Sequence, residues 1–309
     1  MRIFRLALFA TILCSLCSCN NGDGDFSGGN RYPILFGSVD SRAVADIESL
    51  KTEGFEVYAY FVGNTGAAAT FEKDVTYSPD QNVWGYEGIQ YWIPGTNYWF
   101  KAFYPSNLDG LEVNNTNNAQ SFTISDFDIN KQVDVMVSNQ ESCSVGAQSD
   151  VPTWPENSNN TGSVVNLKFN HILACVVIKV KSEIDNITIR TIELGGADDF
   201  GDYNGETWSS ENTTTITMTS GTSLTKGADF ADVTKGGILV IPNGSTGKTL
   251  KIEASNKVYN INFPAGTWEK GNKYTYTVSI KQDDIIFVDA APYVEEWESE
   301  SATGSVIIK

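Results

Sequence analysis

The fold is decided by the stretch LKFNHILACVVIKV, residues 167–180. Alternate residues are apolar up to Phe169, whereas residues of both parities are apolar from Ile172 onward. Alternation with a period of two predicts a half-buried β-strand, and a short continuous apolar run predicts a strand buried on both faces. The change of parity near His171 predicts a bulge or a bend between two sheets.

The sequence on both sides of this stretch also has the character of β-strands. The segment FEVYAYF (55–61) alternates between apolar and polar positions, as a half-buried strand does. Clusters such as Pro242-Asn243-Gly244 separate the strands and supply turns. One short helix is predicted at 43–51. Further strands are expected at 98–104, 133–138, 164–181, 187–194, 213–219, 237–241, 249–254, 257–263, 273–280 and 285–288. The pattern predicts an all-β protein built of sandwiches.

A polar stretch at 146–162 divides the chain. It contains two prolines and an asparagine-rich run, and it has little apolar surface to bury, which is typical of a long exposed loop or linker. A chain of 309 residues is long enough for two domains. We therefore expect an N-terminal β-sandwich domain at 32–160 and a C-terminal one at 161–309.

The N-terminus reads as an export signal. Two arginines precede the apolar run 6–16, which is too short for a permanent transmembrane helix. The ending LCSC (16–19) resembles the lipobox of bacterial lipoproteins, which implies a signal peptide at 1–18 and acyl chains on Cys19. The alternative is an ordinary cleaved signal. Residues 19–31 are rich in glycine and asparagine and are expected to form a flexible tether that lipid holds at a membrane.

Composition disfavours several classes of function. Acidic residues outnumber basic ones by 38 to 21, and the net charge of −17 disfavours nucleic acid as a partner. The single histidine, His171, cannot form a His-based metal cluster, and no G-x-S-x-G motif is present. The acidic loop 198–206 lacks the first acidic ligand of a calcium loop and is interpreted as a solvated hairpin tip. We expect no catalytic residues, no metal and no cofactor.

Two further groups of residues leave alternatives open. Cys143 and Cys175 would be the only free thiols of an exported chain, and an oxidising compartment permits a disulfide between them. Cys175 lies in an apolar strand, where a thiol is commonly a small hydrophobic group, so free thiols are favoured. Six aromatic residues are either a sugar-stacking platform or, the favoured interpretation, core side chains: Trp84, Tyr86, Tyr91, Trp92, Tyr98 and Trp99.

Taken in order, several segments of the chain resemble the fimbrillin family, the subunits of type V pili of Gram-negative gut and oral anaerobes. Besides 55–61 and 167–180, the segments are ILFGSVDSRA (34–43), YWIPGTNYWFKAFYP (91–105), VDVMVS (133–138), GGILVIPN (236–243) and WEKGNKYTYTVSI (268–280). The resemblance implies two transthyretin-like antiparallel β-sandwich domains in tandem. It also implies a surface-exposed lipoprotein of the outer membrane that is built into a fimbria and takes part in adhesion. Whether the chain serves as tip, stalk or anchor stays open.

The resemblance further implies assembly by strand exchange. In the family an arginine-specific protease removes the first strand, and a neighbouring subunit fills the groove with its own strand. Here the displaced strand corresponds to 32–38, with Ile34 and Phe36 on one face and Leu35 on the other. The cut corresponds to the bond between Arg42 and Ala43. Arg31 is less favoured, because cutting there would leave the strand in place; an anchor subunit could also keep it.

The expected partners follow from this route. They are other fimbrial subunits, the arginine-specific protease, the outer membrane through the lipid, and a ligand on a host or bacterial surface. The candidate donor is 285–309, with apolar segments at 285–288 and 306–308. The same residues are alternatively an edge strand of their own domain. The alternative function is a monomeric surface glycan-binding lipoprotein.

Overall fold

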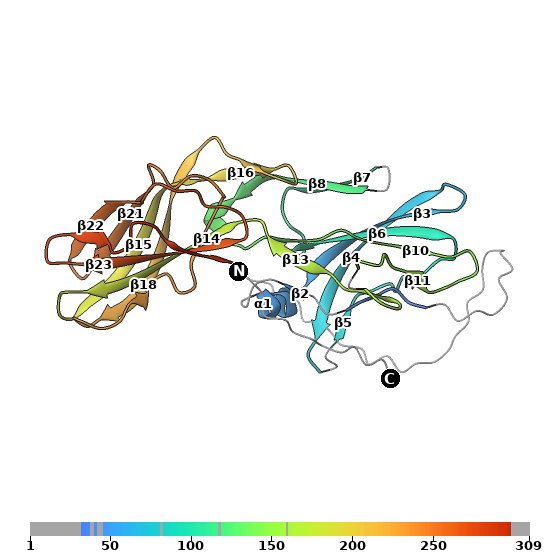
Figure 1. Cartoon of the computed structure of the whole chain (residues 1–309), viewed down its shortest axis with the longest axis horizontal. Coiled ribbons are helices and arrows are strands. Elements are labelled where there is room, and N and C mark those ends of the chain that lie inside the picture. The colour runs from blue at the N-terminus through green and yellow to red at the C-terminus, as the bar shows by residue number, and fades with distance from the viewer. Residues whose placement is uncertain are drawn as a thin grey trace, which may run out of the picture. The chain divides into compact units, whose positions relative to one another are not determined.

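A computed structural model describes residues 32–37, 40–41, 46–80, 83–116, 119–158 and 160–297. Throughout these ranges the regular elements are β-strands, apart from helix α1 (Asp46–Glu53) and the single-turn helix η1 (Ile129–Lys131) (Figure 1). The predicted all-β class is confirmed. The predicted short helix is confirmed as α1, which ends at Glu53 instead of the expected residue 51; residues 43–45 of the prediction lie outside the described residues.

The strands of the first half of the chain are mostly part of one large sheet with the order β2-β13-β9-β6-β3-β4-β5, to which β10 and β11 add beside β6. Their bounds are β1 (Leu35–Phe36), β2 (Asp40–Ser41), β3 (Phe55–Gly63), β4 (Ala68–Ser78), β5 (Val83–Gly85), β6 (Thr96–Tyr104), β7 (Leu111–Thr116), β8 (Ala119–Asp128), β9 (Met136–Ser138), β10 (Glu141–Val145), β11 (Pro152–Thr153), β12 (Val164–Val165) and β13 (Lys168–His171).

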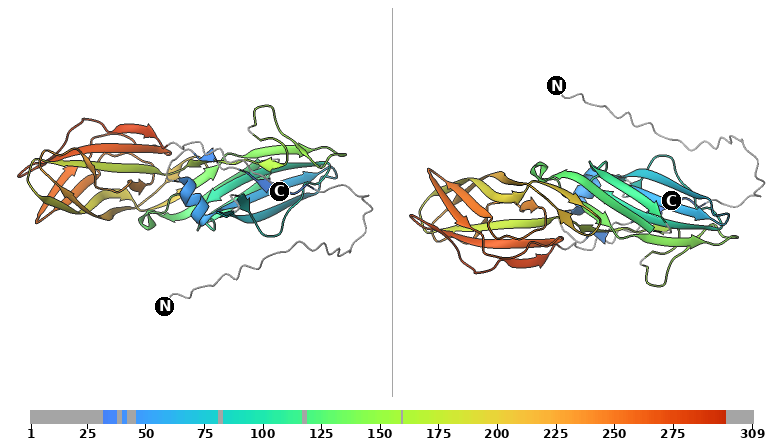
Figure 2. Two further views of the ribbon diagram at one scale, coloured as in Figure 1. Left: turned by 90° about the horizontal axis from the view of Figure 1, so that it is seen from below. Right: turned by 90° about the horizontal axis from the view of Figure 1, so that it is seen from above.

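The second half forms two further sheets, with the orders β19-β14-β23-β24 and β18-β15-β21-β22; β20 pairs with β14 and β25 pairs with β23. The strands, yellow-green to red in both views of Figure 2, are β14 (Ala174–Ser182), β15 (Ile187–Asp198), β16 (Phe200–Tyr203), β17 (Trp208–Ser209), β18 (Thr213–Leu224), β19 (Ala231–Asp232), β20 (Ile238–Val240), β21 (Thr249–Ala254), β22 (Lys257–Asn262), β23 (Asn272–Ile280), β24 (Ile285–Phe287) and β25 (Tyr293–Glu296).

The stretch 167–180 passes from one sheet to another. Strand β13 pairs with β9 and β2 of the first half, whereas β14 pairs with β20 and β23 of the second. Cys175, Val176 and Val177 are all buried, so β14 is covered on both faces. The predicted bend between sheets is confirmed, and it lies at residues 172–173.

Three strand pairs are parallel, although the resemblance implied antiparallel sandwiches: β1 with β12, β2 with β13, and β14 with β23. Each joins segments far apart in the chain, because a parallel pair needs a long crossover connection. All other ladders between the strands β1 to β25 that the structure describes are antiparallel. The sequence alternation fixes which face of a strand is buried but not which strand lies beside it.

The two halves of the chain share one sheet and one core. The sheet β17-β16-β8-β7 places the yellow strand β16 beside the green strand β8 (Figure 1). A hydrophobic cluster likewise combines Phe122, Ile124 and Phe127 of the first half with the buried residues of β14, β15 and β23. A second cluster contains side chains from 34–169. The division into domains at 160/161 stays a prediction, and β12 and β13, which follow it, pair with strands of the first half.

Candidate functional site

The first strand has a hydrogen-bonded neighbour along one edge at residues 90–92. The backbone N–H of Ile34 donates to the carbonyl of Gln90 over 2.8 Å, and the N–H of Trp92 donates to the carbonyl of Tyr32 over 3.1 Å. These bonds run in both directions, as in an antiparallel ladder. The segment 32–34 is therefore held by backbone groups and not by side chains alone.

The opposite edge of the same segment is also occupied. Leu35 and Phe36 of β1 lie beside Val164 and Val165 of β12 in a parallel ladder, and the N–H of Gly37 donates to the carbonyl of Val165 over 2.9 Å. The first strand is thus inserted between two segments that are distant in the chain. Its removal would leave unpaired backbone groups on both sides.

The side chains of the first strand fill the core of the first half. Ile34 is 0% exposed and Phe36 is 3% exposed, whereas Leu35 is half-buried. The ring of Phe36 lies 5.4 Å from that of Tyr86 and 6.2 Å from that of Phe100. Burial of an Ile or Phe side chain stabilises by about 1.5–3 kcal/mol. The alternation predicted for Ile34, Leu35 and Phe36 is the one that the structure shows.

Tyr86 and Gly37 contribute to the close fit between the first strand and the residues around it. The hydroxyl of Tyr86 donates to the carbonyl of Ile34 over 2.8 Å and accepts from the N–H of Gln90 over 3.1 Å. Burial raises the pKa of Tyr86, so its hydroxyl remains a donor at neutral pH. A Cβ atom on Gly37 would clash with the side chains of Asn166 and Val164. The residues around the first strand therefore form a groove that fits it closely.

The predicted cleavage position follows directly in the sequence. Strand β2 pairs in parallel with β13, with Asp40 beside Lys168 and Ser41 beside Phe169. The described residues nearest to the proposed cut are therefore Asp40 and Ser41, which directly precede Arg42. Arg42 and Ala43 themselves lie outside the described residues, as do Arg31 and Cys19, so processing and lipidation stay predictions.

The C-terminal residues that the structure describes belong to the sheet of β23. Strand β24 pairs with Val278–Ile280, and β25 pairs with Asn272–Thr275 at the other end of β23. The side chains of β25 are exposed, with Tyr293 at 68%. The following residue, Trp297, is buried, and its ring stacks on His171 at 3.8 Å. The segment 285–296 is thus an edge of its own sheet, and 298–309 lie outside the described residues.

The single histidine and the two thiols have structural environments. Nδ1 of His171 lies 2.7 Å from a carboxylate oxygen of Asp134, and Trp297 covers the ring. Cys143 and Cys175 are both buried and are not joined by a disulfide. Burial, with a smaller contribution from Glu141, raises the pKa of Cys143 to about 12. A thiol that is protonated at neutral pH is a poor nucleophile.

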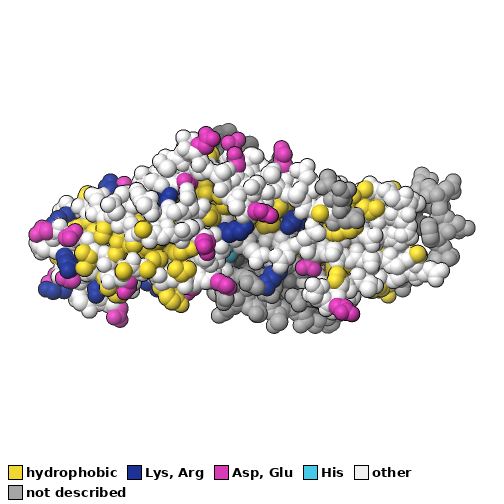
Figure 3. Space-filling view, turned by 45° about the horizontal axis from the view of Figure 1, so that its top comes forward, with side chains coloured by type: hydrophobic (Ala, Val, Ile, Leu, Met, Phe, Trp, Pro, Cys, Tyr) yellow, Lys and Arg dark blue, Asp and Glu magenta, His cyan; other side chains and the backbone are white. Residues whose placement is uncertain are grey.

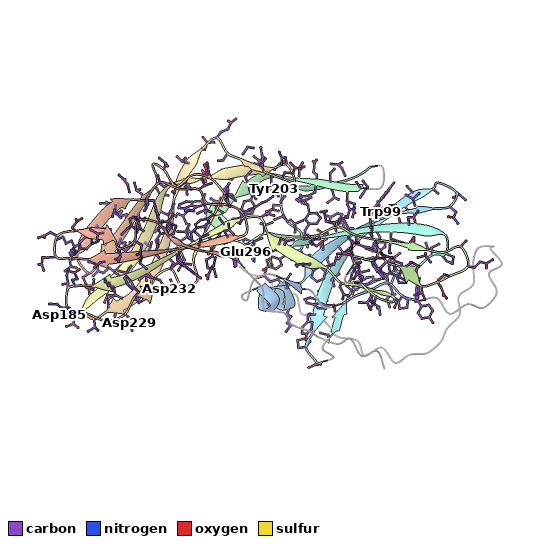
Figure 4. The ribbon with its side chains drawn as sticks, in the orientation of Figure 1. Trp99, Asp185, Tyr203, Asp229, Asp232 and Glu296 are labelled. Carbon is purple, nitrogen blue, oxygen red and sulfur yellow. The ribbon has the colours of Figure 1, made fainter. Side chains whose placement is uncertain are left out.

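The aromatic residues of 84–99 do not share an exposed face. Trp92 and Tyr98 are buried in the core, and Trp84 and Tyr86 pack against it. Trp99, labelled in Figure 4, lies with its ring 5.5 Å from that of Tyr60. The geometry favours core packing over a sugar-stacking platform at this position.

The interpretation of 198–206 as a solvated hairpin tip holds for only part of the segment: residues 204–206 form the turn between β16 and β17, whereas the residues before them belong to a sheet. Residues Phe200–Tyr203 form β16, which pairs with β8. The carboxylate of Asp198 is buried, 3.5 Å from Nζ of Lys248. The sequence of β16 does not show an alternation of apolar and polar residues, because one of its two buried positions is Gly201, where a Cβ would meet Ile241. Among the residues described, no three His, Cys, Asp or Glu side chains are grouped as metal ligands.

Two solved structures share the fold of this chain. One is a protein from Bacteroides ovatus ATCC 8483 to which a role in cell adhesion has been ascribed, with a TM-score of 0.56, 12% identity and coverage of 88% of this chain and 100% of that chain. The other is a protein from Bacteroides uniformis ATCC 8492, to which cell adhesion is also ascribed, with a TM-score of 0.52, 16% identity and coverage of 86% and 98%.

A third similar structure is the tip fimbrial protein Mfa3 from Porphyromonas gingivalis with a C-terminal truncation, with a TM-score of 0.43, 12% identity and coverage of 87% of this chain and 100% of that chain. A search of curated proteins finds no match. No helix of the described residues is long and apolar enough to cross a bilayer.

Together, the strands and the inserted first strand define an all-β protein. The family model described as Fimbrillin-like matches residues 41–297, and the chain belongs to this family. Membership supports a fimbrial subunit at the cell surface. It also makes association with other fimbrial components the expected behaviour.

Proposed function

We propose that the chain is a structural subunit of a cell-surface fimbria, exported as an outer-membrane lipoprotein through Cys19. Assembly begins when an arginine-specific protease cuts between Arg42 and Ala43. A neighbouring subunit then places its own strand in the groove that the first strand occupied. The structural role at the surface is consistent with a part in adhesion.

The observation that supports exchange most directly is the insertion of the first strand between residues 90–92 and β12. Because the side chains of Ile34 and Phe36 are buried in the core, the first strand cannot leave without opening that core. Loss of the strand would expose two sheet edges and an apolar groove. Such an edge binds an extended foreign strand tightly, through backbone hydrogen bonds and side-chain pockets.

The pairing of the C-terminal strands supports one choice of donor segment. Because 285–287 and 293–296 pair with β23, their transfer to a neighbour would open their own sheet. Residues 298–309 follow and end with the apolar run 306–308. We propose that this final segment is the donor.

Substitution of Arg42 tests the route. Treating the full chain with an arginine-specific protease should release 1–42 and yield ladders that resist mild heating in detergent. The Arg42→Ala chain should keep its first strand and form at least tenfold fewer ladders, because the groove stays filled. Gel electrophoresis and N-terminal sequencing measure both effects.

Arg31→Ala is the matched control, and it should be cut at Arg42 and assemble as the parent does. Equal assembly of the Arg42→Ala chain would contradict strand removal at this position. A parent chain that is cut at Arg42 but stays monomeric and binds glycans on affinity gels would favour the monomeric glycan-binding lipoprotein instead.

A further inference from the structure

A recess of about 500 Å³ lies where strands of both halves of the chain meet. Its lining includes Lys101 of β6, Tyr203 of β16, Lys270 just before β23 and Trp297 just after β25. An adjoining recess of about 360 Å³ shares Lys101 with it. These volumes are those of sites that hold small molecules. Tyr203 and Glu296, which both line the larger recess, are labelled in Figure 4.

The charge of the larger recess differs from that of the chain. The protein has 38 acidic and 21 basic residues, yet the charged side chains lining this recess are two lysines and one glutamate, Glu296. Basic side chains gather near the middle of the face shown in Figure 3. A locally positive recess on an acidic protein attracts anions that the remaining surface repels.

Lys101 is the more unusual of the two lysines. Its Nζ lies 5.3 Å from the centre of the Phe122 ring, and within the described part of the chain no carboxylate forms an ion pair with it. Burial lowers the pKa of Lys101, and no neighbouring acid offsets this. A partly buried ammonium group with only a ring as partner is costly, and an anionic ligand would offset the cost.

Lys270 is oriented by neutral groups. Its Nζ donates to the hydroxyl of Tyr203 over 2.9 Å and to the backbone carbonyl of Glu206 over 2.6 Å. An ammonium group has three protons to donate, so one remains for a ligand. Tyr203 therefore positions the second cation of the recess without neutralising it.

The rest of the lining suits hydroxyl groups and a ring. The side chains of Asn139 and Asn170 line the recess and are joined by a hydrogen bond of 3.0 Å, which leaves amide donors and acceptors for a ligand. Tyr203 and Trp297 add aromatic side chains to the lining. Cations, amides and aromatic carbon together match a carboxylate on a polyhydroxylated ring.

We propose that this recess binds an acidic saccharide residue, with its carboxylate on Lys101 and Lys270 and its hydroxyls on Asn139 and Asn170. The site is separate from the six aromatic residues of 84–99. The proposal does not depend on strand exchange, since none of these four residues belongs to the first strand.

The test uses the full chain in a non-ionic detergent and titration calorimetry with glucuronate, glucose and acetate. Glucuronate should bind at least tenfold more tightly than glucose, which lacks the carboxylate, and than acetate, which lacks the ring. Lys101→Met and Lys270→Met should each weaken glucuronate binding at least tenfold. Lys226→Met, a change at an exposed lysine outside the recess, should leave it unchanged. Thermal unfolding verifies that each variant is folded.

Three results would overturn the proposal. Unchanged affinity in both folded lysine variants would place the ligand elsewhere. Equal affinity for acetate would show a simple anion site without saccharide recognition. Binding of glucuronate only to a chain that ends at Trp297 would show that residues 298–309 are the occupant.

Discussion

At the scale of single residues, Glu56 shows how burial changes the acidity of a side chain. It lies on β3 with 5% of its surface exposed, and Tyr58 donates to it over 3.1 Å. Burial raises the pKa of Glu56 to about 7, with further contributions from a hydrogen bond and the charge of Glu72. Between pH 4.5 and about 7 the folded chain thus holds a protonated carboxyl group that would be ionised in the unfolded chain.

The sign of the resulting pH dependence follows from proton linkage. The folded state binds more protons between pH 4.5 and about 7, so the contribution of Glu56 to the free energy of unfolding falls as pH rises through this window. Glu56→Gln should raise the free energy of unfolding at pH 8 by about 1–3 kcal/mol and have little effect at pH 4. Urea unfolding at both values measures this.

The exposed Glu112 of β7 supplies the control, because Glu112→Gln should change the stability by a similar small amount at both pH values. An equal effect of Glu56→Gln at pH 4 and pH 8 would contradict the raised pKa. The same outcome would show that the substitution acts through packing.

At the scale of the element, the first strand is held by two ladders and two buried side chains, and its stability can be separated from that of the sheet. Phe36→Ala removes the ring that contacts Tyr86 and Phe100. A buried Phe→Ala change costs about 3–5 kcal/mol. We expect the amides of Ile34 and Gly37 to lose most of their hydrogen-exchange protection, while the ladder between β3 and β6 keeps its own.

Leu35→Ala is the matched control on the neighbouring, half-buried position, and its effect should be about 1 kcal/mol. A uniform loss of protection over β3, β6 and the first strand in Phe36→Ala would contradict independent release of the strand. That result would mean that the groove cannot exist without its strand.

The sequence predicted the elements better than their neighbours. The parity change near His171 predicted the bend between sheets, because burial of a strand face depends on the strand's own residues. The parallel pairing of β14 with β23 could not be predicted, because partner choice depends on residues far apart in the chain. The recess with Lys101 and Lys270 could not be predicted for the same reason: its lining comes from distant segments, and no local motif marks it.

At the scale of the whole molecule, β16 and β17 connect the two halves. Nε1 of Trp208 donates to the carbonyl of Ile172, at the bend between sheets, over 2.7 Å. The same ring lies 5.4 Å from Phe127 and 5.0 Å from Tyr203. Two domains joined only by a linker would unfold separately, whereas a shared sheet and core couple their unfolding.

We therefore expect the parent chain to unfold in one calorimetric transition and Trp208→Ala to unfold in two. The substitution removes the hydrogen bond to Ile172 and the ring contacts that join the halves, at a cost of about 2–4 kcal/mol. Trp84→Ala is the control, because Trp84 packs on Phe55 within the first half alone, and it should lower the midpoint while keeping one transition. A single transition in both variants would show that the coupling does not depend on Trp208. Two transitions in the parent would show that the halves unfold independently despite their common core.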